Sequence, residues 1–95
     1  MTLQEGVSVV VPVYRSKETI RILADRLSEA LIGFDFEIIL IDDASGDGTW
    51  EEVRRITNAH PNVRAYRLGQ NAGQHGALLA GIRAAKFSRL VTLDD

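Results

Sequence analysis

Two pairs of adjacent aspartates each follow a short apolar segment. Asp42 and Asp43 come directly after residues 38–41, and Asp94 and Asp95 come directly after residues 91–93. Carboxylates accept hydrogen bonds from ribose hydroxyls, and carboxylates gathered together suit a hard divalent cation that carries diphosphate oxygens. Aspartates are also common turn and capping residues, and the second pair can equally be an ordinary acidic chain end. The residue types alone leave both interpretations open for each pair.

Two other stretches offer groups that bind ligands. Tyr14 follows Pro12 and Val13 at the end of an apolar segment, and its ring could stack on a flat base, although a partly buried core tyrosine is at least as common. The stretch Asn71–Gly76, with two glycines, is placed to begin a helix whose free backbone N–H groups could receive an anion. That motif is weak alone, and His75 is expected to be a surface or packing residue.

The apolar pattern predicts an alternation of strands and helices that would position these residues. Four consecutive aliphatic residues before Asp42 indicate a strand buried on both faces, as in a parallel sheet covered by helices. Ligands of open α/β sheets bind at the carboxyl ends of such strands. The predicted strands are residues 7–14, 36–42, 62–68 and 89–93, and the three predicted helices end near Gly33, before Pro61 and near Lys86.

Right-handed crossovers make this an α/β, Rossmann-like three-layer fold with a parallel sheet in the order 3-2-1-4. The switch point then lies between the first and fourth strands. Pairing is expected to loosen near Pro12, which has no N–H to donate. Gly81, inside the third helix, costs about 1 kcal/mol against alanine, and a close approach of that helix to the sheet would explain it. Ser16 and Thr49 are predicted N-caps, with Thr49 and Glu52 forming a capping box.

Asp42 and Asp43 are expected to have different roles. Neighbouring side chains on a strand point to opposite faces of the sheet, so both carboxylates face one ligand only if the strand has already ended. One is therefore expected to contact the ligand and the other to be structural, for example by capping the turn at residues 45–48.

Length and composition bound the class of protein. Ninety-five residues are enough for one domain with a small core, so residues 1–95 are interpreted as a single domain. The net charge of −2 gives no electrostatic case for nucleic acid or an anionic membrane. The absence of cysteine excludes disulfides and thiolate chemistry. The sequence begins without a secretory signal and has no apolar run near the ~18 residues of a membrane span, so a cytoplasmic location is expected.

Four blocks of the sequence together resemble a known family. They are similar, in order and spacing, to GT-A-fold glycosyltransferases of family 2, which use nucleotide sugars, and the resemblance covers essentially residues 7–95. The blocks are Val9–Tyr14 (VVVPVY), Ile41–Thr49 (IDDASGDGT), Asn71–Ala77 (NAGQHGA) and Thr92–Asp95 (TLDD). The third block, with Ala80 and Gly81, is similar to the branch that moves a sugar onto a polyprenyl phosphate, dolichyl or undecaprenyl.

The resemblance implies roles for particular residues. Pro12 and Tyr14 would line the nucleoside pocket, and Asp43, with Ile41 near it, would bind the base or ribose, which leaves Asp42 as a structural partner. Asp94 would open a DXD-type motif whose carboxylates face the ribose and the metal-bound diphosphate, so it would bind the nucleotide and, with Asp95, would help to hold Mg²⁺ or Mn²⁺. The donor would be a UDP, GDP or dTDP sugar, and a polyprenyl phosphate would attack its anomeric carbon with inversion; a polysaccharide or other glycan is the alternative acceptor. No catalytic residue is assigned.

Two departures from the family pattern matter. Ser16 stands where the family often has a glutamate, and the DXD motif would need a residue 96. The chain is therefore expected to be a fragment of a longer protein at the cytoplasmic face of the membrane. The fragment is expected to keep a partial nucleotide pocket, to have little or no transferase activity, and to expose apolar surface that leads to self-association.

The residues allow a comparison with three other classes of protein. A phosphoacceptor receiver domain carries its acidic pair after the first strand, where this chain has Pro12-Val13-Tyr14. A dinucleotide-binding oxidoreductase needs G-x-G-x-x-G there, and residues 13–18 contain no glycine. A non-catalytic structural α/β domain stays open.

Overall fold

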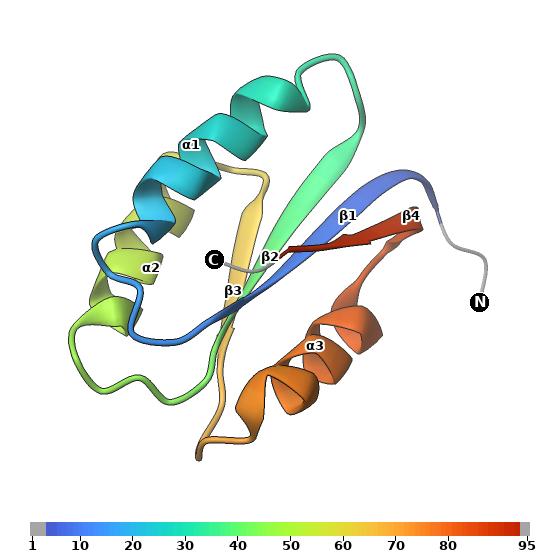
Figure 1. The fold of residues 1–95 in the computed structure, drawn as a ribbon. Coiled ribbons are helices and arrows are strands. Elements are labelled where there is room, and N and C mark those ends of the chain that lie inside the picture. Colours follow the sequence, from blue (N-terminus) through green and yellow to red (C-terminus); the bar gives the residue numbers. More distant parts are fainter. Residues whose placement is uncertain (1–3, 94–95) are drawn as a thin grey trace.

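The strand that carries the first aspartate pair lies inside a four-stranded parallel sheet (Figure 1). The computed structural model describes residues 4–93. Within them the sheet order is β3-β2-β1-β4, which confirms the predicted order and class. The elements are β1 Gln4–Val13, α1 Ile20–Ala30, β2 Phe36–Asp42, α2 Thr49–Ala59, β3 Val63–Arg67, α3 Gly73–Ala84 and β4 Phe87–Thr92.

Helices cover the sheet on both faces (Figure 1). Alternation along β1 and β2 divides their side chains between two apolar clusters. Val9, Val11 and Leu40 join residues of α1 and α2 on one face, whereas Val10 and Ile41 join α3 on the other. None of the helices described here has the length and apolar character needed to cross a membrane.

Gly81 lets α3 lie directly on the sheet. A Cβ atom at this position would lie 2.2 Å from Val10 Cγ1 and 3.3 Å from Ile41 Cγ1. The first distance is far below van der Waals contact, so a side chain at this position would push α3 away from β1. The predicted close approach is confirmed.

Pro12 marks the point where β4 leaves β1. The last β1–β4 pair is Val10 with Thr92, and the Leu93 N–H donates to the Val10 carbonyl at 3.0 Å. Residues two apart on a strand direct their backbone groups to the same side, so the missing N–H of Pro12 faces β4 just beyond that pair. Pairing with β2 continues to Val13 and Asp42. The expected loosening thus occurs on the β4 side only, and it opens the sheet at the switch point.

The helix starts differ from the prediction. α1 begins after Thr19 rather than Ser16. The N-cap of α2 is Gly48 at φ +93°, and Thr49 is the buried first residue of the helix. The Asp47 carboxylate accepts hydrogen bonds from the Thr49 hydroxyl and, at 3.2 Å, from the Thr49 N–H. The hydrogen bond from the Thr49 side chain is the main reason that the pKa of Asp47 is lowered. The predicted capping box is wrong because Asp47, one residue before a left-handed glycine, satisfies the helix start instead.

A buried glutamate, Glu37, links several elements at the end of the sheet where β2 begins. Glu37 accepts hydrogen bonds from Ser8 Oγ at 2.6 Å, Arg64 Nη2 at 2.6 Å and the Lys86 N–H at 2.7 Å. Arg64 also donates to the Ala84 carbonyl at 2.7 Å. Burial by itself would raise the pKa of Glu37, but the hydrogen bonds from Lys86, Ser8 and Arg64 outweigh it, so the pKa is lowered. The sequence analysis did not find this network, which fastens the end of α3 to β1, β2 and β3.

Candidate functional site

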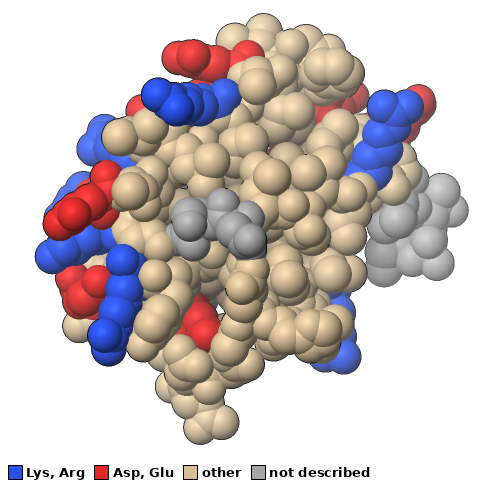
Figure 2. All heavy atoms as spheres, viewed as in Figure 1, with Lys and Arg blue, Asp and Glu red and all other residues tan. Residues whose placement is uncertain are grey.

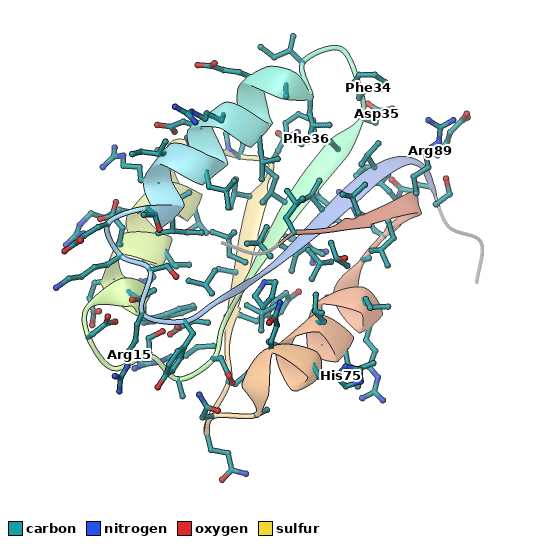
Figure 3. The ribbon with its side chains drawn as sticks, in the orientation of Figure 1. Arg15, Phe34, Asp35, Phe36, His75 and Arg89 are labelled. Atoms are coloured by element: carbon teal, nitrogen blue, oxygen red, sulfur yellow. The ribbon has the colours of Figure 1, made fainter. Side chains whose placement is uncertain are left out.

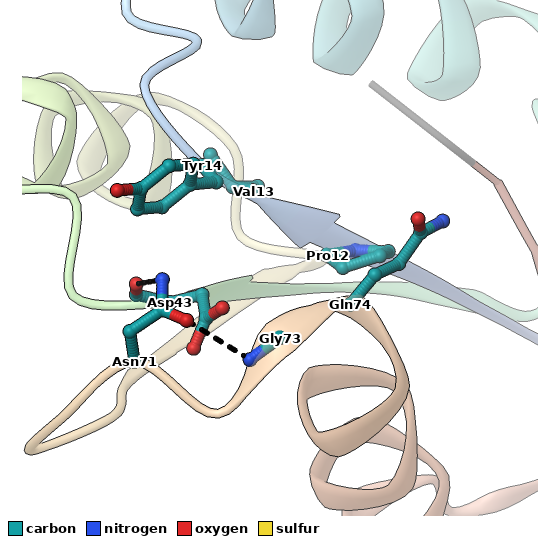
Figure 4. Close-up of a pocket in the computed structure, with 7 residues that line it drawn as sticks. All are labelled: Pro12, Val13, Tyr14, Asp43, Asn71, Gly73 and Gln74. Carbon is teal, nitrogen blue, oxygen red and sulfur yellow. Dashed lines mark hydrogen bonds between the residues drawn. The ribbon is translucent and has the colours of Figure 1, made fainter.

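A cavity of about 540 Å³ opens at the carboxyl edge of the sheet, beside the point where β1 and β4 separate (Figure 4). Three short segments, far apart in the sequence, form its walls. The end of β1 and the residue after it contribute one side, the residue after β2 a second, and the start of α3 a third. The lining residues are Pro12, Val13, Tyr14, Asp43, Asn71, Gly73 and Gln74.

Asp43 joins the end of β2 to the loop that begins α3. Its Oδ1 accepts the Ala72 N–H at 2.7 Å, and its backbone carbonyl accepts from Asn71 Nδ2 at 3.2 Å. Asn71 Oδ1 in turn accepts the N–H of Gly73, a residue at φ +77°, at 3.2 Å. A carboxylate has about four acceptor positions, so the Asp43 side chain keeps acceptor capacity for a ligand while it orders the loop.

Asp42 points to the other face of the sheet. Its side chain is fully buried, and its Oδ1 accepts the Ser45 hydroxyl at 2.6 Å. Its Oδ2 has no hydrogen-bond partner in the described structure and lies 3.8 Å from Arg67 Nε. The two aspartates therefore separate as expected: Asp43 lines the cavity and Asp42 holds the following turn.

Tyr14 forms the aromatic wall of the cavity. The ring lies above the Asp43 carboxylate, and Pro12 lies two residues earlier in the chain, within β1 (Figure 4). The Arg15 guanidinium is 5.1 Å from the Tyr14 ring centroid, which is within the range of a cation–π contact. A flat face and a carboxylate acceptor thus meet in one hollow.

Some predicted residues are not brought to this cavity. Ile41 is fully buried in the cluster beneath α3 and does not line the cavity. His75 is exposed on the outer side of α3 (Figure 3). Asp94 and Asp95 lie outside the described residues. Among residues 4–93 no group of three or more His, Cys, Asp or Glu side chains could hold a metal ion.

The sequence analysis missed two contributors to the site. It treated Asn71 only as part of a glycine-rich stretch, whereas the Asn71 side chain bonds both Asp43 and Gly73. It also assigned no role to Ser45, which accepts the Arg15 N–H at 2.9 Å. The spacing of three residues between Asp42 and Ser45 was the available signal, because short polar side chains at that spacing commonly bond within a turn.

Comparison with known sequences points to one family. The sequence profile of the family described as Glycosyl transferase family 2 matches residues 8–95. Dolichol-phosphate mannosyltransferase of Pyrococcus furiosus is 33% identical over 88 residues, which cover 93% of this chain and 25% of that protein. Undecaprenyl-phosphate 4-deoxy-4-formamido-L-arabinose transferase of Yersinia enterocolitica is 38% identical over 91 residues, which cover 93% of this chain and 28% of the relative. The chain thus spans about a quarter of the length of these relatives.

Solved structures give the same fold. The mannosyltransferase PcManGT of Pyrobaculum calidifontis, in complex with GDP-Man and Mn²⁺, superposes with a TM-score of 0.75 at 25% identity, over 99% of this chain and 29% of that one. Residues 1–349 of S. aureus TarS, in complex with UDP-GlcNAc, superpose with a TM-score of 0.74 at 26% identity, over 93% of this chain and 26% of that one.

Proposed function

The chain belongs to glycosyl transferase family 2, and we propose that its cavity binds the nucleoside part of a nucleotide-sugar donor. The observation that carries this proposal is the placement of Tyr14 and Asp43 in one cavity at the switch point of the sheet. An aromatic ring can stack on any base, and a carboxylate can accept from a base N–H or a ribose hydroxyl. Related structures hold GDP-Man and UDP-GlcNAc, so UDP and GDP are the nucleotides to test, with dTDP as a third.

Three of the lining residues have a proposed task. The Tyr14 ring stacks on the base, and Pro12 forms the adjoining apolar wall. Asp43 accepts from the base or ribose with the part of its carboxylate that the Ala72 N–H does not occupy. The side chain of Ile41 supports α3 from the core, and because it does not line the cavity, any contribution that it makes to binding is indirect.

A divalent cation, Mg²⁺ or Mn²⁺, is the proposed cofactor. Asp94 and Asp95 are hard oxygen donors of the kind these ions prefer, and they follow Leu93, whose N–H is bonded to Val10 at the edge where the cavity opens. They would hold the ion, and a bound cation would neutralise the charge of the departing nucleoside diphosphate. Mn²⁺ accompanies GDP-Man in one related structure.

We further propose that the longer protein transfers the sugar, with inversion, to a polyprenyl phosphate. Support comes from the relatives, whose names specify dolichol phosphate and undecaprenyl phosphate. Such an acceptor would place the longer protein at the cytoplasmic face of a membrane. Transfer to a polysaccharide or another glycan by the same fold is the second candidate. The 95-residue chain corresponds to about a quarter of these relatives, and we expect it to bind nucleotide with little or no transferase activity.

Calorimetric titration tests the nucleotide proposal directly. UDP, GDP and dTDP are each titrated into the 95-residue chain with and without Mn²⁺, with uridine, guanosine and thymidine as diphosphate-free ligands. We expect saturable binding of at least one nucleotide. Absence of binding to all three, by this chain and by a longer chain that contains it, would favour a structural α/β domain.

A further inference from the structure

The peptide that joins Tyr14 to Arg15 is held from both sides. The Tyr14 carbonyl accepts the Ser16 hydroxyl at 3.0 Å, and the Arg15 N–H donates to Ser45 Oγ at 2.9 Å. Arg15 has φ +53°, a left-handed conformation that residues with a Cβ rarely adopt without support. The direction in which the chain leaves Tyr14 therefore depends on these two hydrogen bonds.

Ser45 is itself fixed by Asp42. The serine is buried, and its single hydroxyl proton is donated to Asp42 Oδ1 at 2.6 Å. With that proton committed, the oxygen offers its lone pairs to the Arg15 N–H. A hydrogen bond to a carboxylate is shorter and stronger than one between neutral groups, so Asp42 determines the orientation of the hydroxyl. The contacts form a chain from Asp42 through Ser45 to Arg15.

Each end of this chain of contacts is adjacent in the sequence to a residue that lines the cavity. Asp42 is adjacent to Asp43, and Arg15 is adjacent to Tyr14. Ala44, between Asp43 and Ser45, also has a left-handed backbone at φ +57°. The turn after β2 thus adopts the conformation that brings Ser45 to the end of β1, and one carboxylate orders the segment that presents the aromatic wall.

We propose that Asp42 and Ser45 are positioning residues for the nucleoside pocket. They do not line the cavity; they hold the Tyr14–Arg15 peptide so that the Tyr14 ring lies above Asp43. This inference rests on the proposed nucleotide binding. It gives the adjacent aspartates complementary tasks: Asp43 supplies an acceptor to the pocket, and Asp42 fixes the opposite wall from the other face of the sheet.

Three substitutions test the proposal in the 95-residue chain. Ser45→Ala removes the acceptor for the Arg15 N–H, Asp42→Leu removes the acceptor for the Ser45 hydroxyl while keeping a side chain with the same branching, and Ser45→Thr keeps the hydroxyl. We expect Ser45→Ala and Asp42→Leu to weaken binding of the nucleotide that the unchanged chain binds by about five-fold, which corresponds to one net hydrogen bond. Ser45→Thr is expected to bind as the unchanged chain does.

A double-mutant cycle separates positioning from general stability. In a Tyr14→Ala background, Ser45→Ala should change nucleotide affinity by less than about two-fold, because the group it positions is gone. Hydrogen exchange gives a readout without ligand: the Arg15 amide should exchange faster in Ser45→Ala and Asp42→Leu and stay protected in Ser45→Thr.

The outcomes separate this inference from the function on which it rests. If neither the unchanged chain nor a longer chain that contains it binds any of the three nucleotides, the proposed function fails, and the inference fails with it. If the unchanged chain binds a nucleotide but Ser45→Ala binds equally tightly, or loses the same affinity with and without Tyr14, the positioning role alone is overturned. Equal Arg15 exchange in all four proteins would also overturn it.

Discussion

The Ala72 N–H lies 2.7 Å from Oδ1 of Asp43, so the residue that follows β2 anchors the residue that precedes α3. These two positions are 29 residues apart in the sequence. Their contact closes one side of the cavity and orders the glycine-rich start of α3. A single carboxylate thereby shapes the loop and offers an acceptor to a ligand.

This dual role predicts different effects for two substitutions of Asp43. Asp43→Asn keeps an oxygen for the Ala72 N–H but loses the charge and one acceptor, so nucleotide affinity should fall about ten-fold while stability changes little. Asp43→Ala should lose as much affinity and, in addition, speed hydrogen exchange at Ala72 and Gly73. Equal exchange at these amides in both variants would contradict the anchoring role.

Gly81→Ala should destabilise the fold although alanine is the better helix former. Its Cβ would lie 2.2 Å from Val10 Cγ1, and overpacking of a core typically costs about 1–3 kcal/mol. Gly69→Ala is the matched control, because a Cβ there meets nothing within 4 Å. Urea unfolding should show a lower free energy of unfolding for the first variant and a change within about 0.5 kcal/mol for the second. Equal stabilities would argue against close packing of α3 on β1.

Glu37 should make the stability of the chain depend on pH in the acidic range. Its pKa is lower in the folded state than the usual value for a glutamate side chain, because hydrogen bonds from Lys86, Ser8 and Arg64 stabilise the carboxylate more than burial destabilises it. A carboxyl group of this kind contributes stability above its unfolded pKa and loses it as the pH falls through the folded pKa. Urea unfolding of the unchanged chain, measured from pH 7 down to pH values below 4.5, should therefore show a free energy of unfolding that falls as the pH falls.

Glu37→Gln isolates this contribution. It leaves Arg64 without its charge partner, so it should cost about 1–3 kcal/mol at neutral pH and reduce the acid-dependent loss. Asp25→Asn removes the carboxylate of an exposed pair with His60 and serves as the control, since exposed pairs contribute at most about 1 kcal/mol. An unchanged pH profile in Glu37→Gln would contradict this assignment.

Exposed apolar side chains on α3 and β4 predict self-association. Leu79, Ile82, Leu90 and Val91 are each at least 40% exposed, and β4 pairs only with β1 among the described strands. Charged side chains gather instead over α1 and α2 in the view of Figure 2. Sedimentation should show mass rising with concentration, and Leu90→Lys with Val91→Lys should suppress it. A monomer at all concentrations would contradict the prediction.

Sequence patterns predicted the sheet well because its two central strands, β1 and β2, are largely apolar. The predicted bounds of β2, Phe36–Asp42, match the structure, and the order of strands follows from short right-handed crossovers. The Glu37 network was missed because its partners come from β1, β3 and the segment before β4, and no local pattern relates them. The start of α2 was misplaced because Thr49 reads as an N-cap, whereas the left-handed Gly48 takes that position.

The site was predicted in part for the same physical reason. Strand ends at one edge of a parallel sheet must lie together, which brings Pro12, Tyr14 and Asp43 into one cavity. The resemblance placed Ile41 near Asp43 in the pocket, but the Ile41 side chain lies in the core beneath α3, a direction that depends on which face of the sheet α3 covers. The roles of these residues in binding, and those of Asp94 and Asp95 in holding a metal, stay predictions.

Two tyrosines in similar settings allow the most direct test of nucleotide binding. Tyr14 lines the cavity and is 44% exposed, whereas Tyr66 on β3 is 42% exposed and lies outside the cavity lining. Each has an arginine over its ring, at 5.1 Å and 5.9 Å from the centroid. The measurement is the nucleotide dissociation constant of Tyr14→Ala and Tyr66→Ala beside that of the unchanged chain. Loss of a stacked ring should weaken binding at least about five-fold in Tyr14→Ala, since stacking on an aromatic side chain is worth about 1–3 kcal/mol per base, and should leave the affinity of Tyr66→Ala unchanged. Equal affinities of the two variants would contradict the central claim.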